Sequence, residues 1–137
     1  MADAPTAAEA VSVAEFRSAL RRFARVSERN SRAAGLTPQR YLLLLMIKGA
    51  PDGSERSTVT ELADRLQLAQ STVTELVGRA EETGLVKRER SLDDGRIAYL
   101  RLTDEGERRL AQAFTTNAAE RSALREAFAR LDDQILA

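Results

Sequence analysis

Apolar residues recur at steps of three and four along the first quarter of the chain, which is the spacing of one face of an α-helix. The pattern begins near residue 10 and ends at Gly35, a residue type that commonly terminates helices. Residues 1–9 show no such spacing, and we expect them to be a flexible tail. An amphipathic helix is therefore predicted over residues 10–35. Its apolar face consists of Val13, Phe16, Leu20, Phe23 and Ala24.

The next segment, LTPQRYLLLLMIKG at residues 36–49, has the features of a helix that is buried on all sides. Thr37 supplies a hydroxyl for the helix N-terminus, and Pro38 fits the first helical position because an N–H there has no partner within the helix. Residues 42–47 are apolar without interruption. A helix that is apolar all round must be surrounded by protein, so we predict that this one is central.

Two short helices with few residues between them follow a polar loop at residues 49–57. The sequence TVTE, which begins at Thr58, is a capping box in which Thr58 and Glu61 accept each other's backbone N–H groups. The second helix is expected over residues 70–83, before Gly84. Neither helix is long enough to be stable alone, and such a pair is typical of the helix-turn-helix motif.

A β-hairpin is predicted directly after this motif. Residues 85–86 begin one strand, residues 98–102 alternate along the other, and DDGR at residues 93–96 supplies the turn. A further helix opens at Thr103, whose hydroxyl can cap it. Its apolar stripe continues to the end of the sequence, with a break near residues 116–117.

Composition limits the chemistry that the chain can perform. Its 137 residues suffice for one small domain with additional helices, and 43% of them are apolar. The chain contains no Cys and no His, which excludes thiol nucleophiles, imidazole general bases and nearly all transition-metal sites. We therefore expect no catalytic residues, no metal and no cofactor. The apolar runs are too short to span a bilayer and no signal peptide is visible, so we expect no membrane partner and a cytoplasmic location.

Positive charge is concentrated in two patches. The 21 basic and 21 acidic residues cancel, which argues against indiscriminate binding to nucleic acid. A local patch is nevertheless sufficient for a DNA-binding footprint. The first patch lies in the N-terminal helix and consists of Arg17, Arg21, Arg22, Arg25, Arg29 and Arg32. The second lies in the hairpin and consists of Lys87, Arg88, Arg90, Arg96 and Arg101.

A helix-turn-helix followed by a two-stranded hairpin, between long amphipathic helices, resembles the MarR family of bacterial winged helix-turn-helix regulators. Three segments carry the likeness, and their order is more specific than any one of them. They are GLTPQRYLLLLMI (residues 35–47), TELADRLQLAQSTVTELVGRAEETGLVKRERSLDDGR (60–96) and LRLTDEGERRL (100–110).

The resemblance implies a mainly α fold, in which a three-helix core and a two-stranded wing form a DNA-binding domain at residues 36–103. It also implies dimerisation through the N-terminal helix at residues 10–35 and C-terminal helices at residues 104–137. Members of this family bind palindromic operators as two-fold dimers and usually repress transcription, and many release DNA when a small organic ligand binds. We therefore expect a homodimeric repressor whose partners are double-stranded operator DNA and a small-molecule effector.

Two features depart from the family pattern. Ala69 stands where the family usually has a Ser or Thr capping the recognition helix. That cap, worth about 1 kcal/mol, is expected to be absent or provided by Ser71 or Thr72. The sequence also ends at LDDQILA, where relatives often start one more helix, so a smaller dimer surface is expected.

The second helix of the motif is expected to enter the major groove with its N-terminal, outward residues. Gln pairs well with adenine, and Ser or Thr contacts phosphates, bases or a thymine methyl group. A competing interpretation is that Ser71 and Thr72 only cap the helix. Arg79 could likewise only pair with Glu75, four residues earlier. The candidate contacts are Gln70, Ser71, Thr72, Thr74 and Arg79.

The hairpin turn is expected to hold Arg96 clear of the fold, where the negative potential of a narrow minor groove attracts it. Asp94 or Asp93 is expected to pair with an arginine, because a bare carboxylate facing phosphates would be repelled. The competing interpretation is a solvated hairpin whose aspartates only form the turn. The candidate DNA contacts of the hairpin are Asp94 and Arg96 at the turn, and Lys87, Arg88 and Arg90 as phosphate contacts.

Several interpretations stay open for the terminal helices. Arg25, Arg29 and Arg32 share one helix face. One interpretation is that they form solvated ion pairs. The alternatives are that they pair with acids of a partner subunit, such as Asp132 and Asp133, or that they bind an anionic effector. Aromatic residues at helical spacing, such as Phe23 and Tyr41, suit either a core or a ligand pocket. The expected dimer contacts are Phe16, Leu20, Leu110, Phe114, Leu124, Phe128 and Leu131.

Two alternative functions compete with operator binding. The neutral net charge and the acidic residues of the helix-turn-helix also suit a winged domain used only for protein contacts. Selection from a pool of random DNA duplexes would separate operator binding from a role in protein contacts only, because specific DNA binding depends steeply on salt. An enzyme is the third alternative. It would need a carboxylate site in a pocket, and no spacing in the sequence suggests one.

Overall fold

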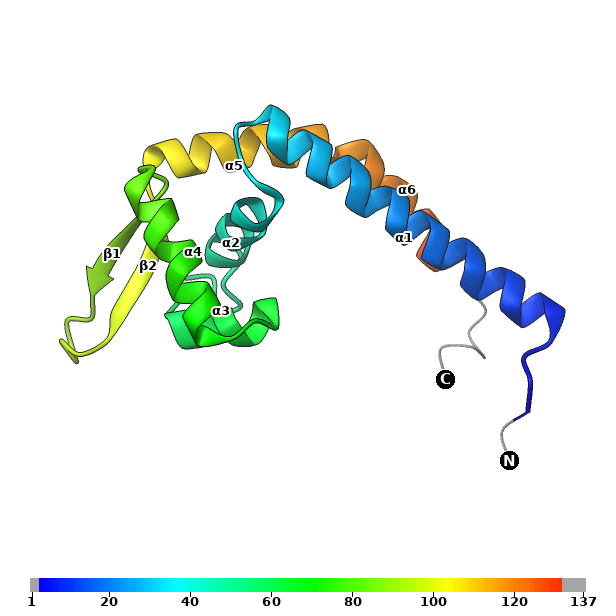
Figure 1. Cartoon of the computed structure of the whole chain (residues 1–137), viewed down its shortest axis with the longest axis horizontal. Coiled ribbons are helices and arrows are strands. Elements are labelled where there is room, and N and C mark those ends of the chain that lie inside the picture. The colour runs from blue at the N-terminus through cyan, green and yellow to red at the C-terminus, as the bar shows by residue number, and fades with distance from the viewer. Residues whose placement is uncertain (1–2, 132–137) are drawn as a thin grey trace.

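The computed structural model describes residues 3–131, which form six helices and one two-stranded antiparallel sheet. The elements are α1 (Ala7–Ala33), α2 (Pro38–Lys48), α3 (Val59–Leu66), α4 (Gln70–Glu82), β1 (Val86–Arg90), β2 (Ala98–Leu102), α5 (Asp104–Thr116) and α6 (Ala118–Ala129). Figure 1 shows a lobe, which contains α2, α3, α4 and both strands, and an arm, which consists of α1, α5 and α6. The expected mainly α fold with a winged helix-turn-helix is confirmed.

α1 begins at Ala7, three residues before the predicted start at residue 10. The Thr6 hydroxyl accepts a hydrogen bond from the Glu9 N–H at 3.1 Å, and the Glu9 carboxylate accepts one from the Thr6 N–H at 2.9 Å. This capping box stabilises a first turn rich in alanine, which the hydrophobic spacing alone does not show. The segment expected to be a flexible tail is therefore helical from residue 7 onward.

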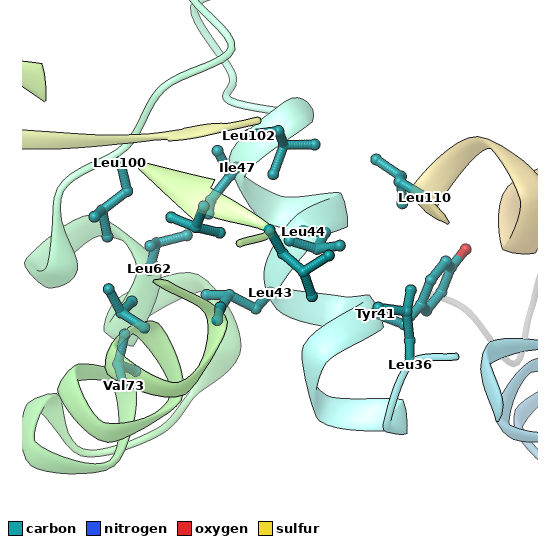
Figure 2. Close-up of a cluster of buried hydrophobic side chains, with 14 of the residues drawn as sticks. Leu36, Tyr41, Leu43, Leu44, Ile47, Leu62, Val73, Leu100, Leu102 and Leu110 are labelled. Atoms are coloured by element: carbon teal, nitrogen blue, oxygen red, sulfur yellow. The ribbon is translucent and has the colours of Figure 1, made fainter. Parts of the chain in front are cut away.

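α2 lies at the centre of the core, as its uninterrupted apolar run predicts. Leu43, Leu44 and Ile47 are completely buried. Figure 2 shows them among side chains from α3, α4 and β2. Burying such a side chain stabilises the fold by roughly 1.5–3 kcal/mol, so α2 anchors the lobe. Leu42 differs from its neighbours, because it is 43% exposed and borders a cavity beside α1.

α3 and α4 form the predicted helix-turn-helix. Thr58 and Glu61 make the expected capping box, with side chain to backbone distances of 3.1 and 3.2 Å. Gln67 ends α3 in the left-handed conformation, with φ 56°, and this turns the chain toward α4. The inward face of α4 carries three buried residues, Val73, Val77 and Ala80. The opposite face of α4 is left free of the core.

β1 and β2 form the predicted hairpin, with Val86 opposite Leu102. Residues 91–97 connect the two strands and contain the expected turn sequence. Ser57 adds one antiparallel bridge to Leu100, which ties the loop before α3 to the wing. The wing is thus attached to the lobe at its base and extends away from it at its tip (Figure 1).

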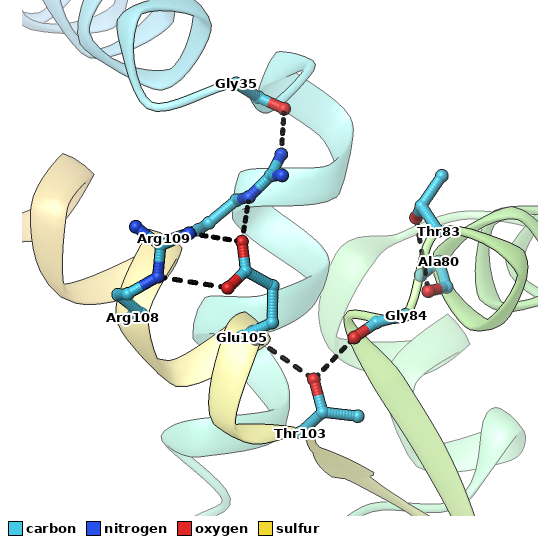
Figure 3. A network of polar contacts seen from close by, with 9 residues as sticks. Gly35, Ala80, Thr83, Gly84, Thr103, Glu105, Arg108 and Arg109 are labelled. Atoms are coloured by element: carbon cyan, nitrogen blue, oxygen red, sulfur yellow. Dashed lines mark hydrogen bonds and ion pairs between the residues drawn. The ribbon is translucent and has the colours of Figure 1, made fainter.

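A polar network fixes the start of α5 against the base of the wing (Figure 3). The Thr103 hydroxyl donates to the Gly84 carbonyl oxygen at 2.6 Å and accepts from the Gly106 N–H at 3.0 Å. α5 passes so close to the wing that a Cβ on Gly106 would lie 2.1 Å from the Leu85 carbonyl oxygen. This approach therefore requires glycine at position 106.

Glu105 and Arg109 connect the same helix start to the segment between α1 and α2. Its carboxylate accepts hydrogen bonds from Arg108 and from Arg109, and the Arg109 Nε lies 2.8 Å away. Arg109 also donates to the Gly35 carbonyl oxygen at 3.1 Å. Hydrogen bonds from Arg108 and then Arg109 lower the pKa of Glu105 to about 2. Arg109 thus ties α5 to the connection between α1 and α2, and Glu105 orients Arg109.

The arm is built from three helices, of which α5 and α6 are separated at Asn117, where the break was predicted. α6 packs along α1, where the Phe16 and Phe128 rings meet edge to face with centroids 5.9 Å apart. Leu110 and Leu131 are also buried within their own chain. No helix within residues 3–131 is long and apolar enough to cross a membrane.

The arginine face of α1 is open to solvent. Arg25, Arg29 and Arg32 are exposed, and none of the ion pairs within residues 3–131 involves them. Asp132 and Asp133, the acids considered as their partners, lie outside the described residues.

Candidate DNA interface

The N-terminus of α4 has no side-chain cap. Ala69 is the N-cap residue, as expected, and its methyl group cannot accept a hydrogen bond. Neither Ser71 nor Thr72 replaces it, because no side-chain cap forms at this helix end. The first N–H groups of a helix have no partner within the helix, so those of α4 are available to a phosphate group.

Polar side chains at the start of α4 point away from the core. Gln70, Ser71 and Thr74 are exposed, and Thr72 is half-buried. The buried valines Val73 and Val77 lie on the inward face of the same helix and determine its rotation on the lobe. The predicted contacts from this helix therefore lie together on its outer face.

Two of these candidate residues have partners within the chain. Arg79 Nη2 donates to the Glu75 carboxylate at 2.8 Å, the helical pair considered from the sequence. Gln70 Nε2 donates to the Thr60 hydroxyl at 3.3 Å. An exposed helical ion pair contributes only about 0.3–0.5 kcal/mol. DNA can therefore displace Glu75 from Arg79 with little loss of stability.

The wing tip presents Arg96 to solvent. Its side chain is 92% exposed, while its Nε donates to Asp94 Oδ1 at 3.1 Å. Asp94 also accepts the Arg96 backbone N–H at 3.0 Å, and the Ser91 hydroxyl accepts the Asp94 N–H at 3.2 Å. The hydrogen bond from the Arg96 side chain is the main reason why the pKa of Asp94 is lowered. The expected pairing of Asp94 with an arginine is confirmed.

The basic residues of β1 lie on different faces of the hairpin. Arg88 Nε donates to the Glu81 carboxylate of α4 at 3.0 Å, and Arg90 Nη1 donates to the Gly95 carbonyl oxygen at 2.6 Å. Lys87 is exposed on the opposite face, because successive side chains of a strand alternate. The sequence suggests one group of three phosphate contacts, whereas the structure places only Arg88 and Arg90 on one side.

Gln39 is a further candidate contact that the sequence pattern does not indicate. It lies near the start of α2 and borders a shallow hollow together with Thr72, Glu75 and Arg79 of α4. Gln39 is far from α4 in the sequence, and only the packing of α2 against α4 brings the two together. The sequence shows a polar residue near the start of a helix, but it does not show that this residue lies beside α4.

The assembled surface contains cations and hydrogen-bond donors rather than a reaction centre. The outer face of α4, the free helix N-terminus and the wing tip can all bind phosphates or base edges. Within residues 3–131 no group of three acidic residues is placed to hold a metal ion. The geometry therefore suits recognition of nucleic acid.

Known transcription regulators are similar to this chain in sequence. A family model described as the MarR family matches residues 34–97. YsmB of Bacillus subtilis, an HTH-type transcriptional regulator, is 28% identical over 129 residues, which cover 91% of this chain and 84% of YsmB. The transcriptional repressor YetL of the same organism is 32% identical over 92 residues, which cover 67% of this chain and 54% of YetL.

Solved structures share the fold. AbsC, a MarR family transcriptional regulator from Streptomyces coelicolor, superposes with a TM-score of 0.70 at 22% identity, covering 96% of this chain and 85% of AbsC. A mutant of MarR from E. coli in complex with operator DNA gives a TM-score of 0.65 at 18% identity, covering 88% of this chain and 81% of that protein. The chain belongs to the MarR family.

MarR-family proteins are DNA-binding transcription regulators and not enzymes, which decides among the functions considered from the sequence. The winged helix of this MarR-family regulator is therefore a DNA-binding unit. The alternative of a winged domain used only for protein contacts, and that of a carboxylate enzyme, are both less consistent with this membership.

Proposed function

We propose that this regulator is a repressor that binds a palindromic operator as a homodimer and is released by a small organic ligand. The observation that carries the proposal is the position of two exposed groups: the polar face of α4 and Arg96 at the wing tip lie on the lobe, away from the free end of the arm (Figure 1). The relative YetL, named as a repressor, supports repression. Since a repressor acts on chromosomal DNA, we place the protein in the cytoplasm.

In this proposal α4 enters the major groove. Its uncapped N-terminus and the hydroxyls of Ser71 and Thr72 meet the phosphates, while Gln70 and Thr74 contact base edges. Arg79 exchanges its partner Glu75 for DNA. Specificity then comes from the few side chains on the outer face of α4, and affinity comes from phosphate contacts.

In this proposal the wing contacts the DNA beside the groove that α4 enters. Arg96 enters the adjacent minor groove, and Asp94 holds its guanidinium in an extended position rather than facing the phosphates itself. Arg88 and Arg90 contact phosphates on the face of the hairpin nearest α4. Lys87, on the other face, contributes a longer-range attraction.

The arm provides the surface for a second copy. Large apolar side chains are exposed along all three of its helices, and such a row is typical of an interface. Leu124 and Phe16 are half-buried at its edge. Leu110 and Leu131, also expected as dimer contacts, support the surface from inside their own chain. The exposed members are Val11, Val13, Leu20, Phe114 and Phe128.

The effector site that we propose lies between the arm and the lobe. A cavity of about 290 Å³ is lined by α1 and α2, with Phe23 and Tyr41 among its residues. Of the aromatic residues whose role the sequence left open, Tyr41 belongs to the core and also lines this cavity, whereas Phe23 lines the cavity only. A ligand that enters here would push α1 away from α2 and change the position of the lobe.

The charge of this cavity indicates the ligand class. The exposed residue Glu28 is among its lining residues, which include no Lys or Arg. A carboxylate would repel an anion, so a neutral or cationic aromatic molecule fits this cavity better than an anion does. Matched benzamides and benzoates test this point. The benzamide should release operator DNA at the lower concentration, and the opposite order would contradict the assignment.

DNA selection followed by footprinting tests the operator proposal. The protein is mixed with random duplexes, and the retained sequences are expected to contain two inverted half-sites whose centres are one helical turn, about 34 Å, apart. Footprinting in the genome that encodes the protein should show protection over the promoter. Selected sequences without symmetry would contradict binding as a two-fold dimer.

Sedimentation tests the dimer separately from DNA binding. Phe128→Glu places a charge on the exposed apolar row of the arm and should give a monomer. Ser122→Glu, an exposed polar position on the same helix, is the matched control and should remain dimeric. A dimeric Phe128→Glu protein would show that copies associate through another surface.

A further inference from the structure

Asn117 occupies the break between α5 and α6 and is only 1% exposed. Asparagine at the start of a helix usually caps it with its side chain. Here the Asn117 side chain makes no cap on α6. It points into the protein instead, which indicates a role other than starting the helix.

The Asn117 side chain joins both parts of the molecule. Its Oδ1 accepts from Asn30 Nδ2 of α1 at 2.6 Å. Its Nδ2 lies 3.4 Å from the Ser27 hydroxyl of α1 and 3.5 Å from the Tyr41 hydroxyl of α2. Asn30 also donates to the Thr116 carbonyl oxygen at 3.3 Å, which satisfies an acceptor at the end of α5. The break in the arm is therefore held by α1 and by the lobe at once.

A buried polar cluster of this kind specifies geometry more than it adds stability. Desolvation offsets much of the energy of its hydrogen bonds, so apolar residues of similar volume would stabilise the contact at least as well. Apolar residues, however, pack at many angles, whereas hydrogen bonds have a preferred direction. The presence of Asn117 thus selects one angle between α5, α6 and α2.

We propose that Asn117 is a positioning residue that sets the angle of the lobe on the arm, and with it the separation of the two α4 helices in the dimer. This inference rests on the proposed binding of a palindromic operator by a homodimer. Two α4 helices must reach successive major grooves about 34 Å apart, so the angle of each lobe decides which half-site spacing fits. The break is far from α4, and a small rotation there produces a larger displacement at the DNA (Figure 1).

The test measures tolerance of half-site spacing. Duplexes carry the selected half-sites at their best spacing or with added base pairs, each of which turns the second half-site by about 35°. The wild-type protein should lose about tenfold or more in affinity on the first addition, comparable with one mismatched base pair. Asn117→Leu keeps the number and branching of the side-chain heavy atoms but removes the hydrogen bonds. It should lose less than about threefold.

A second variant covers the case in which Asn117→Leu does not fold. Tyr41→Phe removes only the hydroxyl on the lobe side of the cluster, and it should flatten the spacing profile in the same direction. Thr115→Ala, at an exposed position beside the break, is the control and should keep the wild-type profile. Binding to a duplex with one half-site is measured for every variant and should not change.

The outcomes separate the two proposals. A flattened profile with unchanged half-site binding supports the positioning role of Asn117. A uniform loss at every spacing, or an unchanged profile, would overturn it and leave Asn117 as a purely structural residue. If the wild-type protein shows no preference for two half-sites, the homodimeric operator proposal itself fails.

Discussion

Arg88 of β1 and Glu81 of α4 form an ion pair, with the Arg88 Nε 3.0 Å from the Glu81 carboxylate. The pair connects the wing to the helix that carries the candidate base contacts. Its two side chains remain partly exposed, at 46% and 30%. Arg88 can therefore brace the wing and still reach a phosphate group of bound DNA.

Replacing Arg88 should make DNA binding less sensitive to salt. Each phosphate contact releases counterions and adds about 0.9 to the slope of log K against log salt concentration. Arg88→Gln should reduce that slope by about 0.9, as measured by fluorescence anisotropy over a salt series. Arg125→Gln, which removes an exposed arginine of α6, is the control for net charge. Equal slopes in all three proteins would show that Arg88 only braces the wing.

Arg96→Ala should weaken operator binding by roughly 1–3 kcal/mol without changing the unfolding temperature. The Arg96 side chain is almost fully exposed and pairs with Asp94 of the same turn, so its removal leaves the core intact. Arg96→Lys should keep the salt dependence but lose preference for a narrow minor groove, because arginine suits that groove. If Arg96→Ala binds as tightly as the wild type, the wing tip does not contact DNA.

Gly106→Ala should destabilise the fold by about 1–3 kcal/mol, the usual range for a side chain forced into a packed site. Its Cβ would lie 2.1 Å from the Leu85 carbonyl oxygen, so α5 would have to move away from the wing. Gly78→Ala is the matched control, since a Cβ there meets nothing within 4 Å. It should stabilise α4 by roughly 0.5–1 kcal/mol. Urea unfolding measures both, and equal effects would contradict the close approach.

The stabilising contribution of Glu105 should disappear in acid. Its pKa is lowered from 4.5 to about 2 by Arg108 and Arg109. A carboxyl group whose pKa is lower in the folded state stabilises the protein fully above its unfolded value, and the contribution is lost as the pH falls through the folded value. Glu105→Gln should therefore be less stable than the wild type at pH 7, and this difference should shrink between about pH 4.5 and 2.

Urea unfolding at several pH values measures this difference. Glu82→Gln, at an exposed position of α4, is the control and should differ little from the wild type at any pH. A deficit of Glu105→Gln that stays constant in acid would mean that the ion pairs with Arg108 and Arg109 do not form in solution.

Local signals explain why most of the elements could be predicted. The capping hydroxyls of Thr37, Thr58 and Thr103 all accept backbone N–H groups where expected. The break in the C-terminal helices also lies at its predicted place. The start of α1 was predicted too late, because the hydrophobic spacing does not register a capping box followed by alanine.

The candidate DNA surface was predictable only in part. The rotation of α4 follows from its buried valines, so its outward polar residues could be named in advance. The faces of β1 depend on how the hairpin packs against α4, and that packing separates Lys87 from Arg88 and Arg90. Gln39 reaches the surface only through the packing of α2 against α4.

The sequence alone determines the helices, the hairpin, the two basic patches and the absence of thiol and imidazole groups. These features depend on residue type and on the spacing between near neighbours. The cluster at Asn117 depends on contacts between residues that are 76 to 90 positions apart, and the arm depends on the packing of α1 against α6 near the other end of the sequence. Such contacts form only when the whole core closes, since the entropy lost in joining distant segments must be offset by many contacts made together.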